Sequence, residues 1–124
     1  MKIYKCNICM KVIEVFYEVP VPTVCCNEDM ELMEANTSDG AAEKHLPIYQ
    51  VDKLHEGMTV TVGENIHPME DNHYIMWIAQ VIDNIVTRVD LNPGDEPIGK
   101  FKYIKGSTIY AYCDKHGLWK AEVN

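Results

Sequence analysis

The sequence predicts an all-β protein in which a small metal-binding domain precedes an antiparallel β-sandwich. Short runs rich in β-branched and aromatic residues alternate with turn residues after position 40, and no stretch reads as a long helix. Four of the five cysteines lie within the first 26 residues, a segment too short to form a hydrophobic core by itself.

The first predicted domain spans residues 1–35. It holds four candidate metal ligands, Cys6, Cys9, Cys25 and Cys26. Residues 11–17 are rich in β-branched and aromatic side chains, which predicts a strand. A Cys-x-x-Cys loop offers two ligands from one turn, so we expect all four thiolates to bind one metal that stabilises this domain. The cysteines alone leave zinc and iron equally open, and the absence of an export signal disfavours disulfides.

Residues 36–40 are polar and turn-forming, and we expect them to be a linker. Residues 41–124 form the second predicted domain, in which about seven short strands favour an antiparallel β-sandwich. The predicted strands are Leu46–Val51, Met58–Val62, Tyr74–Asp83, Ile85–Leu91, Lys100–Ile104, Thr108–Tyr112 and Leu118–Val123. Residues 92–95, Asn-Pro-Gly-Asp, predict a turn. Both faces of residues 74–83 are apolar, so we expect this strand to be buried on both sides.

A second set of candidate ligands, four histidines and one cysteine, lies in this domain. Cys113 and His116 are three positions apart, so a single tight turn can present both to one metal. The remaining candidates are His45, His67 and His73. Five such ligands exceed the four of a closed structural zinc site. They suit iron better, with one position left open for a substrate.

Other residues near these motifs receive structural interpretations. The fifth histidine, His55, is expected to be an ordinary surface or core residue. Met69 is expected to fill a pocket wall rather than bind the metal. We expect Trp77 and Trp119 to be core walls beside the metal.

Charge and composition restrict the partners. The formal net charge of -8 argues against nucleic acid or an anionic membrane surface. No run of about eighteen apolar residues is present, which argues against a membrane span. No basic start followed by an apolar run precedes Cys6, so we expect no signal peptide and a cytoplasmic location.

With these two ligand sets, the chain resembles the desulfoferrodoxins, the two-iron superoxide reductases that protect anaerobic microbes from oxidative stress. The resemblance covers nearly the whole chain. The four N-terminal cysteines match the desulforedoxin-like centre, and the catalytic iron signature is matched by Glu43-Lys44-His45, His67-Pro68-Met69 with His73, and Cys113 with His116. It implies a desulforedoxin-like Fe(Cys)4 domain, followed by an immunoglobulin-like β-sandwich that carries a catalytic non-haem iron.

The resemblance also implies a mechanism. In the family the four histidines lie around the iron in a plane, the cysteine is axial, and superoxide takes the position opposite the thiolate. One-electron reduction and protonation then release hydrogen peroxide. Lys44 is expected to attract superoxide and to order a proton-donating water, and Glu43 to occupy the open position once the iron is oxidised. Taken without the family, both residues are ordinary surface charges.

The cofactors and partners implied by the resemblance are two irons per chain, no flavin, no haem, a rubredoxin-like electron donor and a second copy of the chain in a homodimer. The sequence departs from the family at two positions. Met10 and Asn27 stand where the family usually has glycine. Asparagine tolerates left-handed backbone, whereas methionine does so poorly.

Two other classes of function remain open. One is a non-catalytic iron or zinc protein, an electron carrier or metal-binding protein whose second site is structural. The other is a zinc-stabilised β-sandwich that serves as an interaction module. The fifth ligand argues against both, because a closed zinc site needs only four of those five residues.

Overall fold

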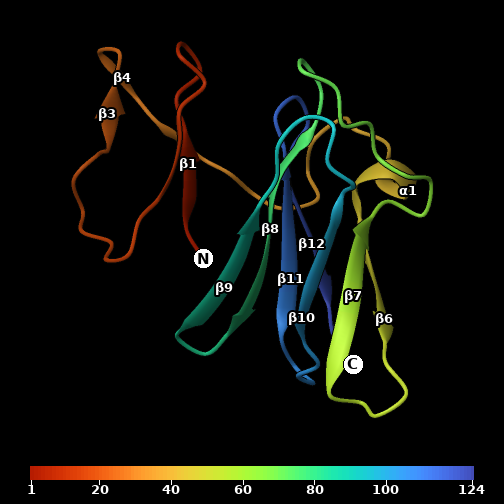
Figure 1. The fold of residues 1–124 in the computed structure, drawn as a ribbon. Helices are drawn as coiled ribbons and strands as arrows, with labels where there is room; N and C mark the ends of the chain where they lie inside the picture. The colour runs from red at the N-terminus through yellow and green to blue at the C-terminus, as the bar shows by residue number, and fades with distance from the viewer. The chain divides into compact units, whose positions relative to one another are not determined.

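The computed structural model describes all 124 residues, which separate into two compact units, Met1–Glu34 and Ala35–Asn124. Strands predominate in both, and the single helix, α1, covers only Ala42–His45 (Figure 1). Every strand pair is antiparallel. The predicted all-β fold class is therefore confirmed. No helix is both long enough and apolar enough to cross a membrane.

The first unit consists of five very short strands. They are β1 (Ile3–Lys5), β2 (Val12–Glu14), β3 (Val24–Cys25), β4 (Glu28–Asp29) and β5 (Glu31–Leu32). Strand β1 lies between β2 and β5, while β3 and β4 form a separate hairpin. The buried hydrophobic residues of this unit are only Ile3, Cys6 and Met30. A core this small cannot stabilise a fold by itself, so we expect bonds from the cysteines to a metal to supply the missing stability.

The predicted strand at residues 11–17 is wrong in its extent, because β2 covers only Val12–Glu14. Phe16 and Tyr17 lie outside it and are exposed. Strands β1, β3, β4 and β5 were not predicted. Each has two or three residues, which is too short to show a periodic pattern in the sequence.

The second unit contains α1 and seven strands in two sheets (Figure 1). The strands are β6 (Pro47–Val51), β7 (Gly57–Val62), β8 (Ile75–Ile82), β9 (Ile85–Asp90), β10 (Ile98–Lys102), β11 (Thr108–Cys113) and β12 (Gly117–Glu122). One sheet has the order β10-β7-β6 and the other β12-β11-β8-β9. All seven strands expected in this part of the chain are present, with β10 beginning two residues before the predicted start at Lys100.

One hydrophobic core joins the two sheets into a sandwich. Val60 and Val62 of β7, Ile78 of β8 and Ile109 of β11 belong to this core, and each is fully buried. Strand β8 is buried on both faces from Trp77 to Gln80, as its sequence predicts. The sandwich is therefore a packed scaffold on whose loops a site can be held rigidly.

The loops at one end of the sandwich are shaped by local backbone features. Cys113 pairs with Gly117 across a three-residue turn, and Gly117 has φ of 76°. Glycine adopts this left-handed conformation without steric cost, which closes the turn. A β-bulge shifts the register between β11 and β8 at Tyr112 and Cys113. Bulges re-aim side chains, and Cys113 belongs to the core with no exposed surface.

The segment 36–40, for which the sequence predicts a linker, lies in the second compact unit. The side chain of Asn36 forms two hydrogen bonds with the backbone of β12. Its side-chain amide donates to the Lys120 carbonyl oxygen at 3.2 Å, and its Oδ1 accepts from the Lys120 backbone N–H at 2.8 Å. The predicted turn at 92–95 is also present, with the Asp95 N–H donating to the Asn92 carbonyl at 3.0 Å.

Candidate metal centres

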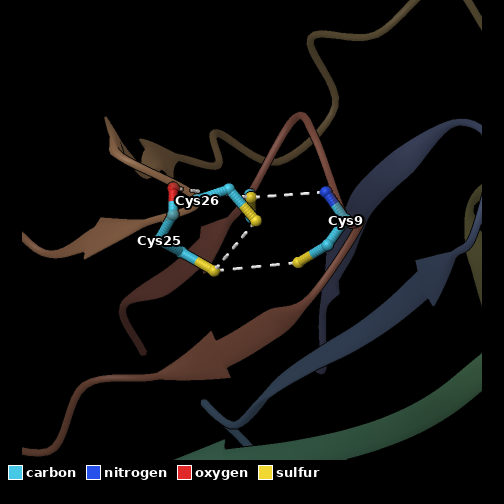
Figure 2. A group of neighbouring side chains, drawn as sticks. Cys9, Cys25 and Cys26 are labelled. Carbon is cyan, nitrogen blue, oxygen red and sulfur yellow. Dashed lines mark hydrogen bonds between the residues drawn. The ribbon is translucent and has the colours of Figure 1, made fainter.

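The four N-terminal cysteines converge on one point. Their sulfur atoms all lie within 4.8 Å of one another, and Figure 2 shows those of Cys9, Cys25 and Cys26 turned inward. The Cys9 and Cys25 sulfurs are 3.7 Å apart, and those of Cys25 and Cys26 are 3.9 Å apart. A disulfide needs about 2.05 Å. Four sulfurs at about 2.3 Å around a tetrahedral metal are separated by about 3.8 Å, so the cluster fits a metal.

Two tight turns hold these sulfurs. The first is the Cys6–Met10 loop, where the Met10 N–H donates to the Cys6 carbonyl oxygen at 2.9 Å. The second is the two-residue turn of the β3–β4 hairpin, formed by Cys26 and Asn27 with φ of 54° and 62°. Met10 also has positive φ, 67°. Both positions where the family usually has glycine therefore have left-handed backbone, and Met10 bears its steric cost.

Backbone amides prepare one of the thiols for metal binding. The N–H groups of Cys9 and Ile8 lower the pKa of Cys6 to about 6. Hydrogen bonding with the other three cysteines, Cys9 first, raises the pKa of Cys26 to about 12. Four thiolates so close together repel one another, so a cation is needed before all of them can be ionised.

In the second unit, His45 and His67 are both held in a metal-binding tautomer. The Nδ1 atom of His45 is 2.7 Å from the Ala41 carbonyl oxygen, and that of His67 is 2.6 Å from the Pro68 carbonyl oxygen. A carbonyl oxygen can only accept, so each Nδ1 carries a hydrogen and each Nε2 keeps a free lone pair. The two Nε2 atoms face each other at 3.0 Å. Two facing lone pairs repel, and a bound cation would remove that repulsion.

Three further donors point at the same place. The Nε2 atom of His73 is buried and has no hydrogen-bond partner in the protein. The Nδ1 atom of His116 lies 3.1 Å from His45 Nε2 and 3.8 Å from the sulfur of Cys113. Ligand atoms of His45, His67, His73 and Cys113 all lie within 4.8 Å of one another. Four imidazole nitrogens and one sulfur thus converge, a donor set that suits a transition metal.

The protonation of this cluster also suits a metal. Burial lowers the pKa of His67 to about 4, and burial is the main cause of the lower pKa of His45 and of His73. These imidazoles are therefore neutral at neutral pH and able to bind. Burial, with a smaller contribution from the charge of Asp114, raises the pKa of the Cys113 thiol. A metal must displace that proton when it binds.

The walls of this cluster agree in part with the sequence interpretation. Trp119 stacks on His45, with ring centroids 4.9 Å apart and planes inclined by 21°. Trp77 instead stacks on Tyr112 at 5.7 Å. The sulfur of Met69 accepts the Ile75 N–H at 3.3 Å, and its side chain packs against the core. His55 is exposed, with its ring edge-on to Tyr103 at 6.2 Å.

Glu43 and Lys44 lie in α1, one turn that ends at the buried His45. Both are exposed. After burial and the neighbouring histidines, the positive charge of Lys44 is a further cause of the lower pKa of His45. The Asn65 N–H donates to the Glu43 carbonyl at 2.9 Å, and the Gly63 N–H to the Leu46 carbonyl at 3.1 Å. The turn that follows β7 therefore holds α1 in place beside the histidines.

Sequence comparison decides the family. The profile described as Desulfoferrodoxin matches residues 37–122, and the profile described as Desulfoferrodoxin, N-terminal domain, matches residues 1–33. This chain belongs to the desulfoferrodoxin family. Desulfoferrodoxins have two iron sites, and the cysteine cluster and the histidine–cysteine cluster are the corresponding donor sets in this chain.

Individual desulfoferrodoxins match over nearly the full length. The desulfoferrodoxin of Nitratidesulfovibrio vulgaris is 46% identical over 123 residues, covering 98% of this chain and 95% of the relative. The superoxide reductase of Pyrococcus abyssi is 34% identical over 107 residues, covering 70% of this chain and 91% of the relative. The crystal structure of the superoxide reductase from Treponema pallidum has the same fold, with a TM-score of 0.72 at 23% identity, covering 96% and 98% of the two chains.

The long-range bonds of two residues, Asn36 in the second unit and Asp114 beside Cys113, have no signal in the sequence. Asn36 lies in the expected linker, yet it is bonded to Lys120 of β12, 84 positions away. Asp114 sits between two predicted ligands but bonds to Tyr74, 40 positions away. Such pairings depend on the sheet register, which local patterns do not determine.

Proposed function

We propose that this desulfoferrodoxin is a superoxide reductase, which reduces superoxide by one electron to hydrogen peroxide. The proposed catalytic iron is held by His45, His67, His73, Cys113 and His116. The observation that carries the proposal is the convergence of all five donors, with His73 Nε2 buried and otherwise unpaired. A closed zinc site takes four ligands, so a fifth favours a reactive metal over a structural one.

Iron bound there supplies a one-electron reductant whose potential a thiolate ligand can tune. Superoxide needs one electron and two protons to become hydrogen peroxide, and no dioxygen is released. The chain's own residues provide the surroundings for this step. The buried imidazoles remain neutral, so the cluster adds no positive charge of its own, and Trp119 covers one face of His45.

Lys44 and Glu43 are proposed to act at the mouth of the site. Lys44 is exposed and adjacent to His45, where a positive charge attracts the superoxide anion and orders a water that donates a proton. Glu43 is a carboxylate on the same turn, and it would occupy the open position once the iron is oxidised. Both roles rest on family membership together with the position of α1.

The first centre is proposed to hold iron through Cys6, Cys9, Cys25 and Cys26 in a domain of residues 1–35. Its role is electron relay or stabilisation, while residues 41–124, after the 36–40 linker, carry out the reaction. The very small core of this unit supports a stabilising role.

The proposed electron donor is a rubredoxin-like protein. We place the protein in the cytoplasm of an anaerobe, where electrons from this donor would reach superoxide through the second iron. A homodimer is proposed as the assembly. Phe16 and Tyr17 expose 93% and 83% of their surfaces, which supports an interface on the first unit. Sedimentation of wild type and Phe16→Ser tests this assembly. A wild-type monomer would contradict it.

Metal analysis tests the redox character of the protein. Protein from an iron-replete anaerobic culture should contain two irons per chain and show charge-transfer bands from both thiolate sites when oxidised. Colourless protein with zinc in both sites would contradict the proposal and favour a structural metal-binding protein.

A further inference from the structure

Asp114 joins the two loops that carry the second set of ligands. Its backbone N–H donates to the Tyr74 carbonyl oxygen at 3.1 Å, and its Oδ1 accepts the Tyr74 N–H at 3.0 Å. Asp114 directly follows Cys113, and Tyr74 directly follows His73. The reciprocal pair therefore fixes the Cys113 turn against the His73 loop, although the two are far apart in sequence.

The same carboxylate lies beside the sulfur ligand. Asp114 Oδ1 is 3.9 Å from Cys113 Sγ, and Cys113 is fully buried. A charge next to a buried group acts through a lower dielectric than water, so it is screened less than a surface charge. Exposed groups of both signs also act on the cluster, since the charge of Lys115 lowers the pKa of His73 and the charge of Glu70 raises it. Of these charges, the Asp114 oxygen is the one in contact with the sulfur.

We propose that Asp114 is a positioning residue with two effects on the second centre: it clamps the Cys113 and His73 loops together, and its negative charge lowers the reduction potential of the bound iron. The proposal rests on the proposed function, because it requires iron in this site. A nearby negative charge favours the oxidised metal, which carries one more positive charge than the reduced form. A neutral acceptor of the same shape would keep the clamp and lose the effect on potential.

Two substitutions separate these effects. Asp114→Asn keeps the Oδ1 acceptor and removes the charge, whereas Asp114→Ala removes both. Asp71→Asn is the matched control, because it removes one charge from an exposed side chain in the His73 loop. The measurements are iron content, the midpoint potential from an anaerobic redox titration, and the melting temperature of the iron-loaded protein.

We expect Asp114→Asn to keep its iron and to favour the reduced state about tenfold more than wild type, which is about 59 mV for one electron. Asp71→Asn should shift the potential much less. Asp114→Ala should melt about 4–8 °C below Asp114→Asn, because the Tyr74 N–H loses its acceptor.

Equal potentials for Asp114→Asn and Asp71→Asn would overturn the role of the charge. Equal melting temperatures for Asp114→Asn and Asp114→Ala would overturn the clamp. Either result, in iron-loaded protein, leaves the proposed function standing. Wild-type protein that binds zinc but no iron at the second site would contradict both the role of Asp114 and the proposed function.

Discussion

The indole of Trp119 stacks on the imidazole of His45 at a centroid distance of 4.9 Å, although the two residues are far apart in sequence. The same indole donates its Nε1–H to the His116 carbonyl oxygen at 3.1 Å. One buried side chain from β12 therefore supports a ligand on α1 and a ligand on the β11–β12 turn. Packing of this kind holds metal ligands in place before the metal arrives.

Trp119→Ala should destabilise the second unit by about 3–5 kcal/mol, because it removes a large buried aromatic residue. Trp119→Phe should cost less, about 1–3 kcal/mol, because it keeps an aromatic ring but leaves the His116 carbonyl without its donor. Urea denaturation of the iron-loaded proteins measures both. Equal stability of wild type and Trp119→Ala would show that the stack is incidental.

Lys44→Ala should slow the second-order oxidation of the reduced second centre by superoxide about tenfold. A unit charge at about 4 Å contributes about 1 kcal/mol in water and about 4 kcal/mol near a protein surface, and the exposure of Lys44 favours the lower part of this range. Lys44→Arg should retain most of the rate because it retains the charge. Raising the salt concentration should slow wild type more than Lys44→Ala. The rate is measured with pulse-generated superoxide.

Lys53→Ala is the matched control for Lys44. It removes an equal charge from an exposed side chain in the loop between β6 and β7, at the other end of β7 from α1. Its rate should stay close to that of wild type. If Lys44→Ala and Lys53→Ala react equally fast at low salt with iron fully bound, Lys44 is an ordinary surface lysine.

In metal-free protein, the free energy of unfolding of the second unit should decrease as the pH falls from about 6.5 to 4. Burial holds the pKa of His67 at about 4, below its usual value of 6.5. In this window the unfolded chain takes up a proton at His67 that the folded chain does not. The contribution of neutral, buried His67 to the free energy of unfolding is therefore fully present above pH 6.5, and it is lost as the pH falls toward 4. One histidine contributes at most about 1.4 kcal/mol per pH unit.

Urea denaturation of metal-free wild type and His67→Gln between pH 7 and pH 4 checks this dependence. His67→Gln should show a shallower fall in the free energy of unfolding. His55→Gln, which replaces an exposed histidine, should follow wild type. Identical slopes for all three proteins would mean that His67 is not buried in its neutral form.

Met10→Gly should stabilise the first centre by about 1 kcal/mol. Met10 is 57% exposed and has φ of 67°, so its side chain gains little from packing while its Cβ opposes the left-handed backbone. Met10→Ala is the control, because it keeps the Cβ and should give no gain. Metal transfer from this site to a competing chelator reports the difference. If Met10→Gly loses its metal to the chelator as readily as Met10→Ala does, the backbone at this position is not strained.

The sequence predicted the sandwich well because strands such as β7 and β8 show strong apolar patterns that their burial requires. It predicted nine candidate ligands because their residue types and spacings are those of metal sites, and the structure brings these side chains into two clusters. It missed strands such as β3 and β4, whose two residues each leave no pattern. The start of β10 was placed late because Pro97 and Gly99 resemble turn residues. The Asp114–Tyr74 and Trp119–His45 contacts join residues far apart in sequence and depend on tertiary register, which no local pattern encodes.

The most direct test of the account is the product formed when fully reduced protein meets superoxide in the absence of any other donor. Wild type should form one hydrogen peroxide per second-site iron if the first centre only stabilises, or two if it also relays its electron, and release no dioxygen. Cys9→Ser should lose the first iron and still form one hydrogen peroxide per second-site iron, whereas Cys113→Ser should keep the first iron and form none by this route. Dioxygen released together with peroxide, or loss of the reaction in Cys9→Ser with the second iron still bound, would contradict reduction at the histidine–cysteine centre.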